Sequence, residues 1–311
     1  MSKLGLALGG GARGLAHIGV LKVLDSEGIE INSITGCSMG AIVGGLYAYF
    51  GNARQVEELI VEAINHPKFI SLGIERLNGN GKGPDKNYFE QFFDYIGTRL
   101  QAYKSLTCLS YFDEIHTKDI YEMIPDVAID GLKLNFSAIA TDLNSGEEIN
   151  FTKGSLRDAI RASSAIPGIF PPVRYQSYFL VDGSASESVP AGKVREIGAD
   201  RVLAVDVIRS LKVVNQPQNI IDILYRTEDI TSFHLSVLRL READLVIRPH
   251  AKQLSWSNFE KAEEIIAAGE FVAKENLNEI KKLLHRNSYL LELGRYIKKL
   301  KLEPEKDAVE L

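Results

Sequence analysis

The sequence contains a G-x-S-x-G pentad, formed by Gly36, Ser38 and Gly40. The pentad lies between an apolar alternation at residues 29–34 that predicts a strand and an apolar stretch from residue 41 that can form a helix. In that setting it is typical of a nucleophile elbow, a sharp turn that exposes a serine hydroxyl at the positive end of a helix. Its flanking positions must be small because the turn leaves no room for bulk. The alternative is a plain turn in which Ser38 only caps the helix, and the pentad alone does not decide between them.

A glycine-rich stretch at residues 9–14 precedes the pentad. It follows an apolar run at 4–8 that predicts a buried strand, and apolar residues at three-residue steps after it predict a helix. Its spacing matches the dinucleotide fingerprint, but that motif needs an acidic residue where the second strand ends, and here the strand ends in Thr-Gly-Cys-Ser. The other use of such a loop is an oxyanion hole, in which backbone N–H groups point at a negative oxygen. Neighbouring parallel strands would place the loop beside Ser38.

A serine nucleophile needs a base. His250 fits the order Ser, Asp, His of one hydrolase fold, but there the nucleophile follows several strands and Ser38 follows the second. His17, near the glycine loop, is more readily explained as a packing or hydrogen-bonding residue. The carboxylate candidate is Asp182, at a predicted strand end before Gly183, where burial could raise its pKa and a hydrogen bond could couple attack to proton transfer. The local sequence leaves Asp182 open as well, since Asp-Gly is also a common turn.

Composition excludes several classes of function. The chain has 311 residues, 45% hydrophobic and 25% charged, enough for a substantial core in one large or two small domains. A net charge of -5 argues against nucleic acid as the main partner. Two cysteines, Cys37 and Cys108, imply no disulfide framework and fit a reducing cytoplasm. No apolar run approaches the ~20 residues of a membrane span, and no cluster of metal ligands is evident.

Residues 67–115 differ in character from the rest, with a glycine-rich loop followed by many aromatic residues. One interpretation is an aromatic helix face in the core, and the other is a mobile cap that offers an apolar surface to an acyl chain. Apolar residues from Phe259 to Leu284 trace one face and predict one C-terminal helix. Further predictions are a hairpin of 132–142 with 147–152, a helix at 155–165 capped by Ser155, strands at 178–181, 201–207 and 245–247, and helices at 220–241 and 287–301.

The motifs together resemble the patatin-like phospholipase family. The glycine loop 9–14, the pentad 36–40 and Asp182-Gly183 occur in that family's order, and stretches 140–146 and 161–172 also look like its bacterial members. The resemblance covers residues 3–210. It implies an α/β fold, a three-layer α/β/α sandwich with a mainly parallel central sheet. It also implies serine acyl-hydrolase chemistry on a Ser-Asp dyad, and we expect neither a metal nor another cofactor.

Carried over to this sequence, the resemblance makes Ser38 the nucleophile and Asp182 the base. The N–H groups of Gly10 and Gly11, together with that of Met39, would form the oxyanion hole. Arg13 would hold the loop or meet a lipid phosphate. The chain departs from the family at Ser184, which follows Asp-Gly where glycine or alanine is usual and adds a side chain beside the base. The remaining motif residues are Gly9, Gly14, Gly36, Gly40 and Gly183.

We therefore expect a cytoplasmic esterase, phospholipase or lysophospholipase that cleaves lipid acyl esters through an acyl-serine, with peripheral contact at the inner membrane surface. The expected catalytic domain is 1–210, including the aromatic-rich cap 67–115, and residues 211–311 form an extension packed on the same domain. The alternative is a weakly active regulatory or lipid-binding protein that keeps the pocket. Head-group preference, acyl-chain length and oligomeric state are not readable from the sequence.

Overall fold

The computed structural model describes residues 2–10, 12–74, 108–207, 211, 220–249, 258–285 and 291–294. Among these residues the sheet has eight strands in the order β5-β6-β3-β2-β1-β7-β8, and β4 pairs with β3. The strands are β1 (Leu4–Leu8), β2 (Ile31–Cys37), β3 (Asn135–Asp142), β4 (Glu148–Phe151), β5 (Val173–Tyr175), β6 (Tyr178–Asp182), β7 (Arg201–Val205) and β8 (Leu245–Ile247). The helices are α1 (Ala16–Ser26), α2 (Met39–Phe50), α3 (Ala53–Asn65), α4 (Pro67–Leu72), α7 (Glu114–Tyr121), α8 (Leu156–Ser163), α9 (Lys193–Glu196), α10 (Ile220–Leu240), α11 (Ala262–Glu275) and α12 (Leu277–His285).

Strand β1 shows how the sheet is buried on both faces. Leu4, Leu6 and Leu8 belong to the larger core, whereas Ala7 belongs to a smaller core on the opposite face. Successive side chains of a strand point to opposite faces, so a strand covered by helices on both sides must be apolar throughout. β1 pairs in parallel with β2 on one side and with β7 on the other.

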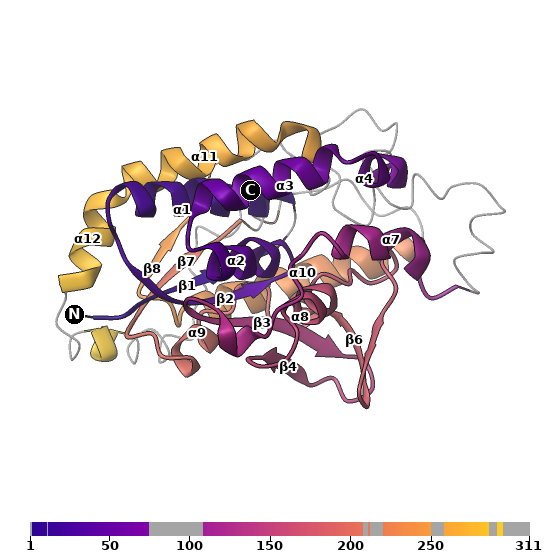
Figure 1. Ribbon diagram of the computed structural model, residues 1–311. Coiled ribbons are helices and arrows are strands. Elements are labelled where there is room, and N and C mark those ends of the chain that lie inside the picture. The colour runs from indigo at the N-terminus through magenta and orange to yellow at the C-terminus, as the bar shows by residue number, and fades with distance from the viewer. Residues whose placement is uncertain are drawn as a thin grey trace.

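The helices form a layer on each face of the sheet. The larger core is closed by α1, α2, α3, α8, α11 and α12, and the smaller one by α9 and the end of α10. Figure 1 shows α1, α3 and α11 running side by side along one face. The parallel set β8-β7-β1-β2-β3 continues into the antiparallel strands β6, β5 and β4. The predicted α/β sandwich with a mainly parallel sheet is confirmed.

Strand β3 brings the ends of β2 and β6 together. Ile139 of β3 pairs with Cys37, the last residue of β2, and the next residue, Ala140, pairs with Asp182, the last residue of β6. Strand β4 occupies the other side of β3 along the same stretch. A strand has two pairing sides, so β2 and β6 share one side of β3 and run toward each other. Their final residues therefore meet.

The predicted single C-terminal helix from Phe259 to Leu284 is wrong. The structure has two helices, α11 and α12, separated at Asn276. Both the backbone N–H and the side-chain amide of Asn276 donate to the carbonyl of Val272, at 3.1 and 2.9 Å. Such side-chain competition for backbone groups is why asparagine often ends a helix. The apolar face continues across the break because both helices pack on the same core.

Other predicted elements within the described residues are found close to their expected places, whereas the helix predicted at 287–301 lies largely outside the described residues. The hairpin of β3 with β4 forms, and the Ser155 hydroxyl accepts the N–H of Asp158 at 3.2 Å to cap α8. The division at residue 210 stays a prediction, although β8 pairs with β7 in the same sheet. In the part of the chain that the structure describes, no helix has the length and apolar character that crossing a membrane requires.

Candidate active site

Ser38 lies at the turn between β2 and α2 with a backbone conformation that few residues other than glycine adopt. Its φ is 55° and its ψ is -121°, and its side chain makes no hydrogen bond that caps α2. The alternative in which Ser38 only caps the helix is therefore wrong. Strained backbone of this kind costs on the order of 1–3 kcal/mol and persists where surrounding contacts enforce it.

Two glycines make this turn possible. A Cβ atom on Gly36 would collide with the carbonyl oxygen of Gly40, and a Cβ atom on Gly40 would collide with that of Leu8. The obstructing atoms are backbone atoms, which cannot move aside as a flexible side chain can. The pentad therefore has glycine at both ends because α2 starts directly against the ends of β1 and β2.

The glycine loop lies beside the serine, as the pairing of β1 with β2 predicts. A Cβ atom on Gly10 would lie 2.8 Å from Cβ and 3.3 Å from Oγ of Ser38. A Cβ atom on Gly14 would lie 2.8 Å from Cβ of Met39, the first residue of α2. The N–H groups of a first helical turn have no partner within the helix, so that of Met39 is suited to an anion. Gly11 lies outside the described residues.

Asp182 is the carboxylate that meets Ser38. It is 2% exposed, at the end of β6, and the Ser38 hydroxyl acts on its carboxyl group in the direction that lowers the pKa. The backbone N–H of Ser184 donates to Oδ1 at 2.9 Å, and the Cys37 thiol donates to the same oxygen at 3.6 Å. The side chain of Ser184, the departure from the family pattern, also acts to lower the pKa of Asp182. The position after Asp182 requires glycine, because a Cβ atom on Gly183 would collide with the carbonyl oxygen of Ile139.

Burial raises the pKa of Asp182 above the ordinary value of 3.8, while the hydrogen bonds from Ser38, Ser184 and Cys37 act in the opposite direction. A carboxylate with a raised pKa is a better proton acceptor for a hydroxyl than an exposed one. Burial also raises the pKa of the Cys37 thiol well above its ordinary value, so this cysteine stays protonated and acts as a donor. The pair of Ser38 and Asp182 is chemically suited to nucleophilic attack.

Ser163 supports the turn at Ser38 by accepting a hydrogen bond from its backbone, a role that the sequence reasoning missed. The backbone N–H of Ser38 donates to Oγ of Ser163 at 3.0 Å, and Ser163 is fully buried at the end of α8. The next residue, Ser164, donates to the carbonyl of Ile160 at 2.7 Å, so the Tyr121 hydroxyl, 3.0 Å away, donates to Ser164. This second contact ties α7 to α8 beside the serine. Ser163 lies 125 positions from Ser38, and the family-like stretch 161–172 that contains it does not by itself indicate a contact with the elbow.

His17 does not act as the base for Ser38. His17 is fully buried, and its Nε2 donates to the carbonyl of Gly9 at 2.8 Å. Burial lowers its pKa to about 4, so the imidazole is neutral near pH 7 and supports the glycine loop. The interpretation of His17 as a hydrogen-bonding residue is confirmed. Arg13 is half-buried between the loop and α1, and His250 lies outside the described residues.

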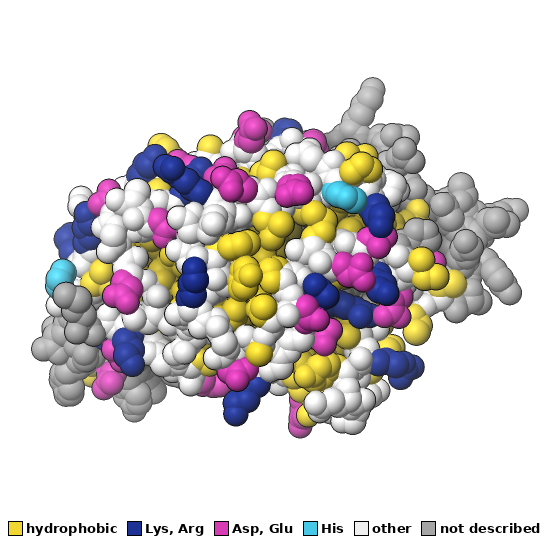
Figure 2. Space-filling view, in the orientation of Figure 1, with side chains coloured by type: hydrophobic (Ala, Val, Ile, Leu, Met, Phe, Trp, Pro, Cys, Tyr) yellow, Lys and Arg dark blue, Asp and Glu magenta, His cyan; other side chains and the backbone are white. Residues whose placement is uncertain are grey.

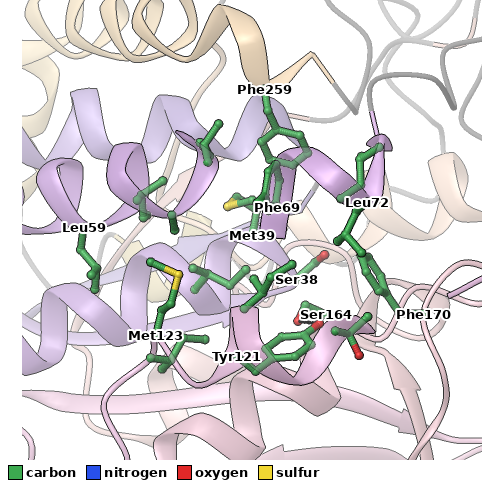
Figure 3. A pocket seen from close by; sticks show the side chains of 18 of the residues that line it. Ser38, Met39, Leu59, Phe69, Leu72, Tyr121, Met123, Ser164, Phe170 and Phe259 are labelled. Carbon is green, nitrogen blue, oxygen red and sulfur yellow. Dashed lines mark hydrogen bonds between the residues drawn. The ribbon is translucent and has the colours of Figure 1, made fainter. Parts of the chain in front are cut away.

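An apolar pocket opens beside Ser38, with a cavity volume of about 140 Å³. Among the described residues that line it, Ser38, Thr117, Tyr121 and Ser164 carry hydroxyls and the others are apolar. Figure 3 shows Ser38 near the middle, with Leu59 and Met123 to one side and Leu72 and Phe170 to the other. Such a lining suits a hydrocarbon chain, with the reacting ester at the hydroxyl end.

The segment 67–115 has aromatic residues both in the pocket and in a packed core. Phe69 of α4 lines the pocket, whereas Phe112 is 7% exposed and packs in a small core with Ile74 and Ile169. The aromatic residues from 88 to 103 lie outside the described residues. Within the described part of the chain, no three His, Cys, Asp or Glu side chains are grouped so that they could hold a metal ion.

A model of the patatin-like phospholipase family matches residues 8–194. The chain belongs to this family. Its members are generally lipid acyl hydrolases. The glycine loop, the pentad and Asp182 all fall within the matched residues, so the family's motifs are the ones that the fold brings together.

The curated relatives that match this chain are longer proteins. NTE family protein Rv1063c of Mycobacterium tuberculosis is 31% identical over 66% of this chain and 49% of its own length. Lysophospholipase NTE1 of Cryptococcus neoformans var. neoformans is 30% identical over 66% of this chain and 11% of its own length. The chain thus spans about half the length of the mycobacterial relatives and less of the fungal one. Among solved structures, VipD from Legionella pneumophila is similar with 12% identity and a TM-score of 0.47, covering 89% of this chain and 67% of that one.

Proposed function

We propose that the protein is a serine acyl hydrolase that cleaves lipid acyl esters, as a phospholipase, lysophospholipase or esterase, with Ser38 as nucleophile and Asp182 as base. The observation that carries the proposal is that the strained elbow serine and a buried carboxylate of raised pKa meet at the adjoining ends of β2 and β6. Membership of the patatin-like phospholipase family supports it. So does the similarity to a relative named as a lysophospholipase.

In the proposed reaction, Asp182 takes the hydroxyl proton while Ser38 Oγ attacks the ester carbonyl. The negative oxygen of the tetrahedral intermediate is stabilised by the N–H groups of Gly10, Gly11 and Met39. Collapse of the intermediate breaks the ester bond, and the protonated Asp182 gives its proton to the leaving alcohol. Water then attacks the acyl-serine with Asp182 again as base, which releases the fatty acid.

The substrate follows from the pocket beside the serine. Its apolar lining can bury the methylene groups of a long acyl chain, which a short-chain acid does not have. A lipid ester has such an acyl chain, and its polar head group would lie outside the pocket. We propose that the protein reaches such a substrate by peripheral contact with a lipid surface.

The test is hydrolysis of p-nitrophenyl butyrate by Ser38→Ala and Asp182→Asn. The kcat of each variant should be about a thousandfold lower, because the nucleophile and its base act as a unit and removal of either one abolishes the activation of the hydroxyl. The control variants are Ser26→Ala and Asp130→Asn, which change an exposed serine and an exposed aspartate. Circular dichroism should show unchanged folds in all four. Wild-type rates in either site variant would contradict the proposed dyad.

A further inference from the structure

Phe259 lines the pocket although it comes from a part of the chain that the family match does not reach. The match ends at residue 194, and Phe259 starts the short 3₁₀ turn Phe259–Lys261 that leads into α11. Its ring packs edge-to-face on that of Phe69, with centroids 5.3 Å apart and planes at 84°. In Figure 3 Phe69 lies between Phe259 and Met39, the residue after Ser38. The half-buried Phe259 thus forms the outer part of one pocket wall.

The position of Phe259 is fixed by how α11 docks on α1. A Cβ atom on Gly269 would collide with the carbonyl oxygen of Ala16, and one on Gly19 would collide with that of Ile266. The two helices therefore approach each other through backbone, which leaves little freedom for sliding. Lys22 of α1 adds an ion pair to Glu270 of α11 at 2.7 Å. Because α1 starts directly after the glycine loop, the same contact ties the C-terminal segment to the candidate active site.

We propose that Phe259 is a specificity-determining residue, a wall of the acyl pocket supplied by the C-terminal segment that favours long acyl chains over short ones. This rests on the proposed function, because it assigns the pocket to the acyl group of the substrate. A two-carbon acyl group ends beside Ser38 and does not reach the ring. A twelve-carbon chain extends along the pocket and packs its methylene groups against Phe69 and Phe259.

The experiment compares Phe259→Ala and Phe259→Leu with the wild-type protein on p-nitrophenyl acetate and p-nitrophenyl dodecanoate. In Phe259→Ala, kcat/KM for the dodecanoate ester should fall about tenfold, with the acetate value unchanged, because one buried aromatic contact with the chain is lost. Phe259→Leu should lie between the two proteins. The matched control is Phe271→Ala, which removes a ring of α11 that is 58% exposed, and it should leave both values unchanged.

A second readout does not depend on turnover. Binding of dodecanoate, measured by titration calorimetry, should be about tenfold weaker in Phe259→Ala than in the wild-type protein or Phe271→Ala, for the same loss of contact. If the wild-type protein hydrolyses neither ester, the proposed function fails and this binding result still decides the role of Phe259. Equal losses on both esters, or dodecanoate binding that does not change, would overturn the proposal.

Discussion

Replacement of Ser163 by alanine should loosen the catalytic turn without touching the serine that it supports. The N–H of Ser38 has Oγ of Ser163 as its acceptor at 3.0 Å, in a site that excludes water. Ser163→Ala leaves that N–H buried and unpaired, at a cost of about 1–3 kcal/mol. This is comparable to the strain stored at Ser38, about 1–3 kcal/mol, so the turn should relax away from its φ of 55°.

We expect two measured effects of Ser163→Ala. The midpoint of thermal unfolding should fall by roughly 2–12 °C, since each kcal/mol corresponds to about 2–4 °C in a domain of this size. The kcat/KM for p-nitrophenyl butyrate should fall at least about tenfold, because a displaced nucleophile loses its alignment with Asp182.

The control separates stability from alignment. Ser137 is also fully buried, and its hydroxyl pairs with that of Thr35 at 2.9 Å in the sheet. Ser137→Ala should lower the unfolding midpoint by a similar amount and leave kcat/KM unchanged. The reasoning is refuted if Ser163→Ala keeps the wild-type kcat/KM, or if Ser137→Ala lowers it equally.

Three further predictions concern pH and packing. Because burial raises the pKa of Asp182 above 3.8, kcat/KM should fall as pH drops through a pKa higher than 3.8, and an acid limb at or below that value would contradict this. Because burial lowers the pKa of His17 from 6.5 to about 4, only the unfolded chain takes up this proton between those values. About 3 kcal/mol of stability should thus be lost as pH falls from 6.5 to 4, with a flatter pH dependence of thermal melts in His17→Gln. Gly269→Ala, whose Cβ meets backbone of α1, should cost about 1–3 kcal/mol in denaturant unfolding. Gly294→Ala, which meets nothing within 4 Å, should cost none.

Local sequence patterns were sufficient to predict the strands and the turn that position Ser38. The apolar run Leu4–Leu8 and the alternation before Gly36 are short-range signals, and each formed the strand that it predicts. The elbow followed because Gly36 and Gly40 occur where bulk cannot fit, which is a property of the turn itself. The single helix predicted from Phe259 onward failed because an apolar face with helical spacing survives a break such as that at Asn276.

The supports of the site were not readable because they depend on tertiary contacts. Ser163 meets Ser38 through the packing of α8 against α2, and Phe259 meets the pocket through the docking of α11 on α1. Ser163 lies in the stretch 161–172 that resembles the family, but that resemblance does not show which atom of Ser38 it contacts. Asp182 stood at a recognisable strand end, but its approach to Ser38 depends on β6 and β2 sharing one side of β3. That register is set by the whole sheet.

The central claim is that Ser38 is a nucleophile activated by Asp182. Its most direct test is reaction with a fluorophosphonate probe, followed by peptide mapping with mass spectrometry. We predict one adduct, on Ser38, that forms rapidly in the wild-type protein and at least about a hundredfold more slowly in Asp182→Asn, since the base that activates the hydroxyl is gone. An adduct on another residue, no adduct, or labelling of Asp182→Asn at the wild-type rate would contradict it.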